Sequence, residues 1–96
     1  MMSFPDRTNQ STAVFTIQAA ADPGALPRVF DLFAKHGLVP NRWVGNMHQS
    51  DARVHVTLEC DGLAEMDIRR LANGLRQILC IETVVTDVRS LARQRA

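Results

Sequence analysis

The chain has 96 residues, 46% hydrophobic and 22% charged, a composition typical of one small globular domain rather than a disordered chain. Eleven basic and ten acidic side chains leave a net charge of +1, which excludes strong electrostatic attraction to nucleic acid. No apolar run is long enough to cross a membrane, no secretion signal opens the chain, and two cysteines are too few for a disulfide framework. We therefore expect a soluble, cytoplasmic domain.

The first strand and helix are the clearest elements. Residues 1–12 are polar and aperiodic, and we expect a flexible arm there. From Ala13 hydrophobic and polar residues alternate, which predicts a half-buried strand that ends at Asp22-Pro23-Gly24. A helix over 25–36 should follow, because apolar residues recur there at helical spacing and Gly37 suits a left-handed helix end. The apolar stripe comprises Leu26, Val29, Phe30 and Phe33.

The remaining elements follow in the order strand, strand, helix, strand. Residues 38–47 predict a strand that Pro40 and Gly45 weaken, so we place it at an edge of the sheet. Residues 53–60 alternate almost perfectly, with Val54, Val56, Leu58 and Cys60 facing the core. A helix over about 63–79, with Asp61 as its cap, and a β-branched strand over 81–88 complete the domain. Residues 89–96 should form a basic tail.

The order β-α-β-β-α-β predicts an α+β fold of the ferredoxin-like type over residues 13–88. Two right-handed crossovers would place both helices on one face of a four-stranded antiparallel sheet with strand order 4-1-3-2. That order leaves the strand after Pro40 at an edge, as its own sequence indicates.

The sequence contains few residues in patterns that are typical of a catalytic site. It has no nucleophile motif, no paired carboxylates in a recognisable pattern and no metal-ligand spacing, so we expect no activity of its own, no cofactor and no metal. Cys60 and Cys80 are best interpreted as small core residues. The outer sheet face lacks the aromatic residues that would bind RNA.

Trp43, the single tryptophan, has two interpretations of about equal weight. It either packs on the helix side of the sheet or contacts a second subunit, since tryptophan is enriched at interfaces and edge strands invite pairing. The second interpretation predicts a symmetric dimer. Its interface would include Asn41, Trp43, Gly45 and Met47.

Residues 21–40, ADPGALPRVFDLFAKHGLVP, resemble an ACT domain. The likeness consists of a strand, the pattern Asp22-x-Gly24-x-Leu26, an amphipathic helix and a second glycine thirteen residues after the first. Within that family the chain is most similar to single-domain small subunits of acetohydroxyacid (acetolactate) synthase and to free-standing ACT proteins. The resemblance implies a dimeric regulatory module of amino-acid metabolism and not an enzyme.

The family resemblance also implies an effector site at a dimer interface, made by the first strand-helix loop and the start of the second strand. Residues at the matching places are Asp22, Gly24, Ala25, Leu26, Val39 and Asn41. Small subunits that sense valine usually carry two asparagines where this chain has Ala21 and Val39. Because those amides are missing, we expect branched-chain amino acids to bind weakly or not at all.

Three hypotheses for function follow. The first is an accessory subunit that binds a large catalytic subunit, with acetohydroxyacid synthase as the expected enzyme. The second is a free-standing sensor that binds a small amino acid. The third is a dimeric interaction module without a ligand. The second and third hypotheses differ in one measurable respect: a ligand that binds only the folded state raises the melting temperature of a sensor and not that of a module without a ligand.

Overall fold

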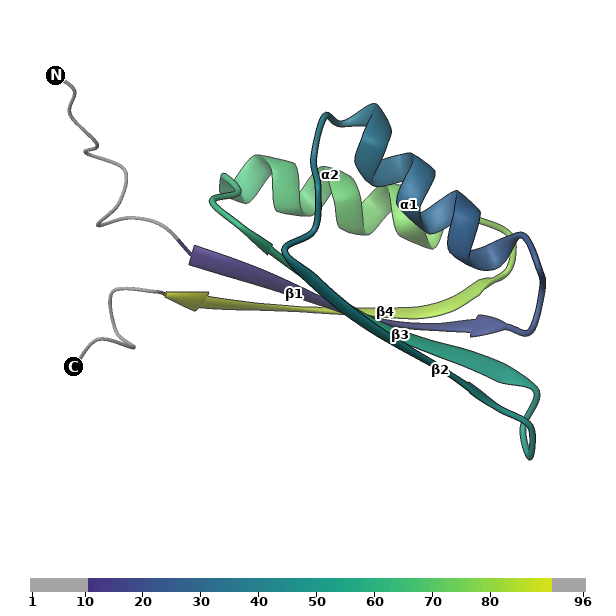
Figure 1. Ribbon diagram of the computed structural model, residues 1–96. Coiled ribbons are helices and arrows are strands. Elements are labelled where there is room, and N and C mark those ends of the chain that lie inside the picture. Colours follow the sequence, from purple (N-terminus) through teal and green to yellow (C-terminus); the bar gives the residue numbers. More distant parts are fainter. Residues whose placement is uncertain (1–10, 91–96) are drawn as a thin grey trace, which may run out of the picture.

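The computed structural model describes residues 11–90, which form four strands and two helices. The order along the chain is strand, helix, strand, strand, helix, strand (Figure 1). The elements are β1 (Ser11–Ala20), α1 (Ala25–Lys35), β2 (Arg42–His48), β3 (Arg53–Asp61), α2 (Glu65–Arg76) and β4 (Ile81–Ser90).

The four strands form one antiparallel sheet in the order β2-β3-β1-β4, and both helices lie on the same face of it (Figure 1). β1 and β3 pair over their whole shared length in the centre, and β2 and β4 are the two edges. Read from the other side, this order is the predicted 4-1-3-2. The ferredoxin-like fold class is therefore confirmed, including the edge position of the strand after Pro40.

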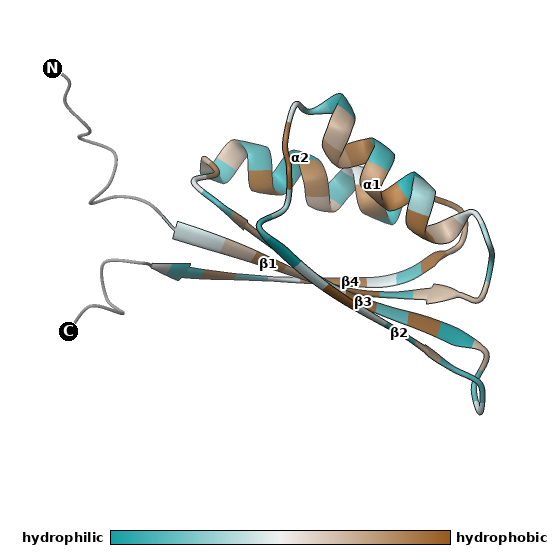
Figure 2. Ribbon diagram, in the orientation of Figure 1, coloured by the Kyte–Doolittle hydropathy of each residue, from teal (hydrophilic) through white to brown (hydrophobic). Residues whose placement is uncertain are grey.

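The core lies between the helix layer and the sheet. Phe15 and Ile17 of β1 and Leu58 of β3 are fully buried, and Phe15 meets Phe33 of α1 edge to face at 5.8 Å between ring centroids. Figure 2 shows hydrophobic and hydrophilic positions alternating along β3, as the sequence predicts for a strand with one covered face. Both cysteines are buried and unpaired, which confirms their interpretation as core residues.

The helix ends match the sequence only in part. Gly37 follows α1 at φ +71°, and Leu38 donates its N–H to the carbonyl of Phe33, so the predicted left-handed helix end is confirmed. The predicted cap of α2 is wrong. Ala64 occupies the N-cap without a side-chain hydrogen bond, because Asp61 still belongs to β3 and accepts a hydrogen bond from Thr12 there.

Several boundaries also differ from the sequence prediction. β1 begins at Ser11, two residues inside the expected arm, and β4 continues to Ser90, so Arg89 belongs to the sheet and not to a tail. β2 begins later than predicted, at Arg42, and α2 is shorter at both ends. The rest of the expected arm and tail, 1–10 and 91–96, lies outside the described residues. Within 11–90, neither helix is long and apolar enough to span a bilayer.

The two helices touch at a glycine. A Cβ built on Gly74 of α2 would lie 2.9 Å from a Leu32 methyl carbon of α1, closer than carbon atoms pack. The mid-helix glycine, which costs about 1 kcal/mol relative to alanine, therefore permits the close helix contact. α2 is in contact with β4, and α1 lies on the opposite side of the helix layer, toward β2 (Figure 1).

Candidate functional site

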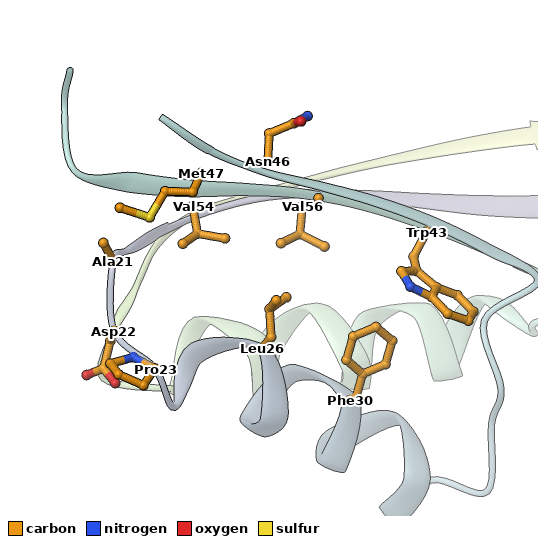
Figure 3. A pocket seen from close by; sticks show the side chains of 11 residues that line it. Ala21, Asp22, Pro23, Leu26, Phe30, Trp43, Asn46, Met47, Val54 and Val56 are labelled. Carbon is orange, nitrogen blue, oxygen red and sulfur yellow. The ribbon is translucent and has the colours of Figure 1, made fainter. Parts of the chain in front are cut away.

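A groove lies between α1 and the edge strand β2 and is here called the α1–β2 groove. Its volume is about 610 Å³, within the range of small-molecule sites. Its lining is mostly apolar and is drawn in Figure 3. The lining residues are Ala21, Asp22, Pro23, Leu26, Phe30, Trp43, Gly45, Asn46, Met47, Val54 and Val56.

Two elements supply the walls of the groove. Leu26 and Phe30 project from α1 toward the sheet, because they lie one helical turn apart on one side of the apolar stripe. Trp43 and Met47 project from β2 toward the helix, as alternate residues of a strand do (Figure 3). Phe30 and Trp43 meet edge to face at 5.5 Å between ring centroids and define one end.

The position of Trp43 combines the two interpretations made from the sequence. Its side chain lies on the helix side of the sheet, yet the residue stays 55% exposed because no residue among 11–90 covers it beyond β2. Gly45 and Met47 lie on the same face of the strand, also exposed. The predicted interface residues thus line one open groove, apart from Asn41, and all are accessible to a second chain.

The loop from β1 to α1 closes the other end of the groove, and its amides bond within the chain. Asp22 Oδ1 accepts the N–H of Gly24 at 2.7 Å, and the Asp22 carbonyl accepts the N–H of Ala25 at 2.9 Å. Ala21 and Asp22 donate their own N–H groups to carbonyls of Ala52 and Ala20. These four N–H groups are therefore used within the chain and are not open to a ligand.

Gly24 itself has an ordinary helical backbone, with φ −85° and ψ −2°, so its conformation does not require glycine. The space beside it is taken by Arg28, since a Cβ on Gly24 would lie 2.5 Å from Arg28 Nη1. The close approach that the glycine permits is that of the chain's own guanidinium group. Ala25, the next predicted site residue, is the first residue of α1 and is buried in the core.

Val39 and Asn41 lie far from the loop in the same chain. Asn41 donates its N–H to Glu59 O and accepts the N–H of Asp61 on Oδ1 at 2.6 Å, whereas Ala21 is bonded to Ala52. Glu59 lies near the end of β3 and Ala52 directly precedes its start, so roughly 20 Å separates the two halves of the expected site. One chain alone does not bring the six predicted effector residues together.

The described titratable groups offer no second site. Among residues 11–90 no three His, Cys, Asp or Glu side chains are placed to share a metal ion. His48 and His55 pack against each other at 4.3 Å between ring centroids on the helix-free face. Burial, and to a lesser extent Asp61, raises the pKa of the Cys60 thiol, which disfavours the reactive thiolate.

The sequence matches the family model of the ACT-like domain over residues 6–93. The chain thus belongs to the ACT-like domain family, as its residues 21–40 indicated. ACT domains are regulatory modules, typically ligand-binding, in enzymes of amino-acid metabolism. No curated protein sequence matches the chain significantly.

Solved structures share the fold at low sequence identity. An uncharacterized protein of Thermotoga maritima, TM1266, has a TM-score of 0.69 and 19% identity, over 82% of this chain and 96% of that one. The ACT domain from GTP pyrophosphokinase of Chlorobium tepidum has a TM-score of 0.68 and 17% identity, over 79% and 96%. The regulatory subunit of aspartate kinase from Thermus flavus has a TM-score of 0.58 and 15% identity, over 83% and 51%.

Sequence reasoning missed the groove as a site. It assigned Phe30 to the core stripe alone and Leu26 both to that stripe and to the effector residues, and it considered Trp43 either as core packing or as a subunit contact. No local signal marked the groove, because a stripe at i, i+3, i+4 and i+7 is what any helix packed on a core shows. It also missed Arg28, whose role beside Gly24 depends on side-chain placement and not on spacing.

Proposed function

We propose that the protein is a non-catalytic regulatory or accessory subunit that works in the cytoplasm on a separate enzyme of amino-acid biosynthesis. The candidate enzyme is acetohydroxyacid synthase, to whose single-domain small subunits the sequence is similar. Membership of the ACT-like family supports the regulatory role. The observation that carries the proposal is the unprotected edge strand β2 beside an open apolar groove.

The edge favours a partner chain for a physical reason. All seven residues of β2 are exposed, and Trp43, Val44 and Met47 are each at least half exposed. Unpaired strand edges with apolar side chains pair readily with other strands. Such a surface is stable in water mainly when a second chain covers it, so we propose a homodimer joined through β2.

The dimer has a natural register. An antiparallel pair of β2 strands about a two-fold axis overlaps fully when Gly45 faces Gly45 of the second copy, because Gly45 is the middle of Arg42–His48. Trp43 of each copy would then lie opposite Met47 of the other. Gly45 offers room, since a Cβ there would meet nothing closer than 3.8 Å.

This arrangement would also bring the two halves of the expected effector site close together. In the full-overlap register the beginning of one β2 lies beside the end of the other, next to the hairpin that Ala21 contacts through Ala52. Val39 and Asn41 of the second copy would then approach the Asp22–Leu26 loop of the first. The proposed effector site is therefore shared between two copies, at the loop end of the groove.

The test is synthase turnover of the large subunit at saturating thiamine diphosphate, with and without this chain. We expect a complex on gel filtration and higher turnover with the chain present, as a domain without catalytic groups acts by favouring one state of its partner. Gly24→Val should reduce the activation, because its side chain displaces Arg28. Arg28→Ala is the companion variant: because it removes the guanidinium that the valine would displace and leaves the loop intact, it should lower the activation in the same way.

Unchanged turnover and no complex would contradict the synthase assignment. A free-standing sensor would then be the function that the groove favours. In that case a small ligand should raise the melting temperature of the isolated protein, since it binds only the folded state.

A further inference from the structure

Two histidines pack together on the helix-free face of the β2–β3 hairpin. His48 is the last residue of β2, and His55 lies diagonally across the ladder on β3, with 4.3 Å between the ring centroids. His48 is exposed, whereas Nε2 of His55 is buried and has no hydrogen-bond partner within residues 11–90. Histidine is the side chain that ordinarily gains or loses a proton between pH 5 and about 8. The end of the hairpin can therefore change its charge near neutral pH.

The charged groups around this pair within one chain come from the hairpin turn, β3 and β4. Asp51 of the turn lies 3.8 Å from Nε2 of His55 and 4.0 Å from the Arg53 guanidinium. Arg53, directly opposite His48 on β3, also pairs with Glu82 of β4. These charges are present in the monomer and in the proposed dimer alike. The difference between the two states comes mainly from the charges that a second copy adds.

The proposed dimer adds a cation beside His48. In the full-overlap register, where Gly45 faces Gly45, residue 48 of one copy faces residue 42 of the other. Arg42 and His48 share the helix-free face with Asn46, whose side chain points there in Figure 3, because alternate residues of a strand lie on one face. Side chains directly opposite in an antiparallel pair are about 5 Å apart at Cβ. Each His48 would thus lie beside the guanidinium of Arg42 of the second copy.

Arg42 of the second copy makes protonation of His48 less favourable in the dimer than in the monomer, since like charges facing each other across strands repel. Glu59 of the second copy lies opposite its own Arg42 but one strand farther from His48, so it weakens this repulsion without cancelling it. Protons therefore bind the monomer better than the dimer, and by linkage the dimer is most stable when His48 is neutral. Association is strongest above about pH 7 and declines as the pH falls through the range in which histidine is protonated.

We propose that His48 makes dimerisation through β2 sensitive to pH, with Arg42 of the second copy as the charge that opposes its protonation. This inference rests on the proposed function in taking β2 as the dimer edge, with Gly45 facing Gly45. Because the proposed effector site is shared between two copies, acidification would take that site apart together with the dimer.

The test is sedimentation equilibrium of the wild-type chain at about pH 7.5 and about pH 5.5, on either side of histidine protonation, with circular dichroism to confirm that the fold persists. At low ionic strength we expect the dimer dissociation constant to be about tenfold higher at the lower pH, because two contacts between His48 and Arg42 contribute about threefold each. High salt should flatten this dependence, since salt screens exposed charges. A dissociation constant that is unchanged or lower at the lower pH would overturn the proposal.

Two variants identify the groups involved. His48→Gln should abolish the pH dependence, because the amide stays neutral, and Arg42→Glu should reverse its sign, because a protonated His48 would then face a carboxylate. His36→Gln is the matched control and should keep the wild-type dependence, since that histidine hydrogen-bonds to the Leu32 carbonyl at the end of α1, in the helix layer. A dependence that persists in His48→Gln, or that keeps its sign in Arg42→Glu, would overturn the assignment.

Failure of the dimer and failure of the pH dependence give different results. A wild-type chain that stays monomeric at both pH values contradicts the β2 dimer, and the pH dependence with it. A dimer whose dissociation constant is the same at both pH values leaves the proposed function standing and overturns only the role of His48. Synthase turnover at the higher pH tests the enzyme partner independently.

Discussion

The two edge strands of the sheet are built differently. β4 is an edge strand that carries charges along its length, and two of its acidic residues have ion-pair partners: Glu82 with Arg53 of β3, and Asp87 with Arg89 of β4 itself. Its pairing with β1 also shifts register between Gln18 and Ala19, which marks a bulge. Charges and bulges are the usual means of keeping an edge from pairing with another chain.

β2 lacks these protections over most of its length. Between Arg42 and His48 it has no charged side chain, and its pairing with β3 runs without a register shift. The groove opens beside this strand and not beside β4. This difference supports the proposal that β2, and not β4, is the surface for association.

We expect the largest effect on association when β2 is given a charged side chain like those on β4. Gly45→Asp places a carboxylate on the helix side of β2, where the backbone has room for it, and two copies would bring two such charges together. We expect dimer association to weaken by roughly 100-fold or more, because facing like charges cost several kcal/mol. Analytical ultracentrifugation measures this directly.

The matched control for that variant is Val85→Asp, an exposed position on β4. It should leave association unchanged. If Val85→Asp separates the dimer and Gly45→Asp does not, β4 is the interface and the assignment made here is wrong.

Loss of the indole should have the next largest effect. Trp43→Ala removes the largest exposed apolar side chain of β2, and interface tryptophans commonly contribute 2 kcal/mol or more. We expect association to weaken by about 30-fold, with helix content by circular dichroism unchanged. A wild-type protein that sediments as a monomer at micromolar concentration would contradict both association predictions.

A smaller effect is expected on the stability of the fold, through the hydrogen bond that holds the start of β2 to β3. Asn41→Ala removes the acceptor of the Asp61 N–H at the entry to β2. We expect a loss of about 1 kcal/mol in the free energy of unfolding, which lowers the melting temperature by roughly 4–8 °C. Asn46→Ala, whose side chain points away from the groove, is the control and should melt as the wild type does.

The smallest expected effect is a pH dependence of the folding stability, caused by Cys60 beside the segment that leads into β2. The buried Cys60 thiol lies 3.7 Å from the Val39 carbonyl, and burial, followed by Asp61, raises its pKa. A raised pKa in the folded state stabilises the fold below the ordinary thiol pKa of about 8.5, and this stability is lost as pH rises toward the folded value. Cys60→Ala should make the decline in stability between pH 8 and 10 shallower, as urea unfolding would show; an unchanged slope would contradict it.

The sequence predicted the fold because the patterns that carry it are local. The alternation in β3 and the stripe on α1 each reflect a covered face, and Gly37 marks a helix end by its left-handed backbone. The misplaced cap has a physical cause. Asp61 remains in the sheet because Thr12, 49 residues earlier, donates a hydrogen bond to it, and no local pattern records such a contact.

The candidate site was less predictable, because it depends on what meets across the sheet. The family pattern placed Asp22 and Leu26 at the site, and both do line the groove. It could not show that Asp22 satisfies the loop amides, since that follows from the turn geometry at Gly24. The distance between Asn41 and the loop became visible only with the register of β3.

Gly74 lies outside the groove, yet it sets how wide the groove is. The Leu32 side chain of α1 rests where a side chain of residue 74 would be, so the glycine lets α1 pack against α2 there. A larger residue there has to displace the Leu32 side chain, and wherever α1 moves with it, away from α2, the space for an occupant shrinks from behind. The capacity of the groove is thus controlled by a residue that no occupant touches, and selection or engineering at that position would change ligand size without altering a single lining residue.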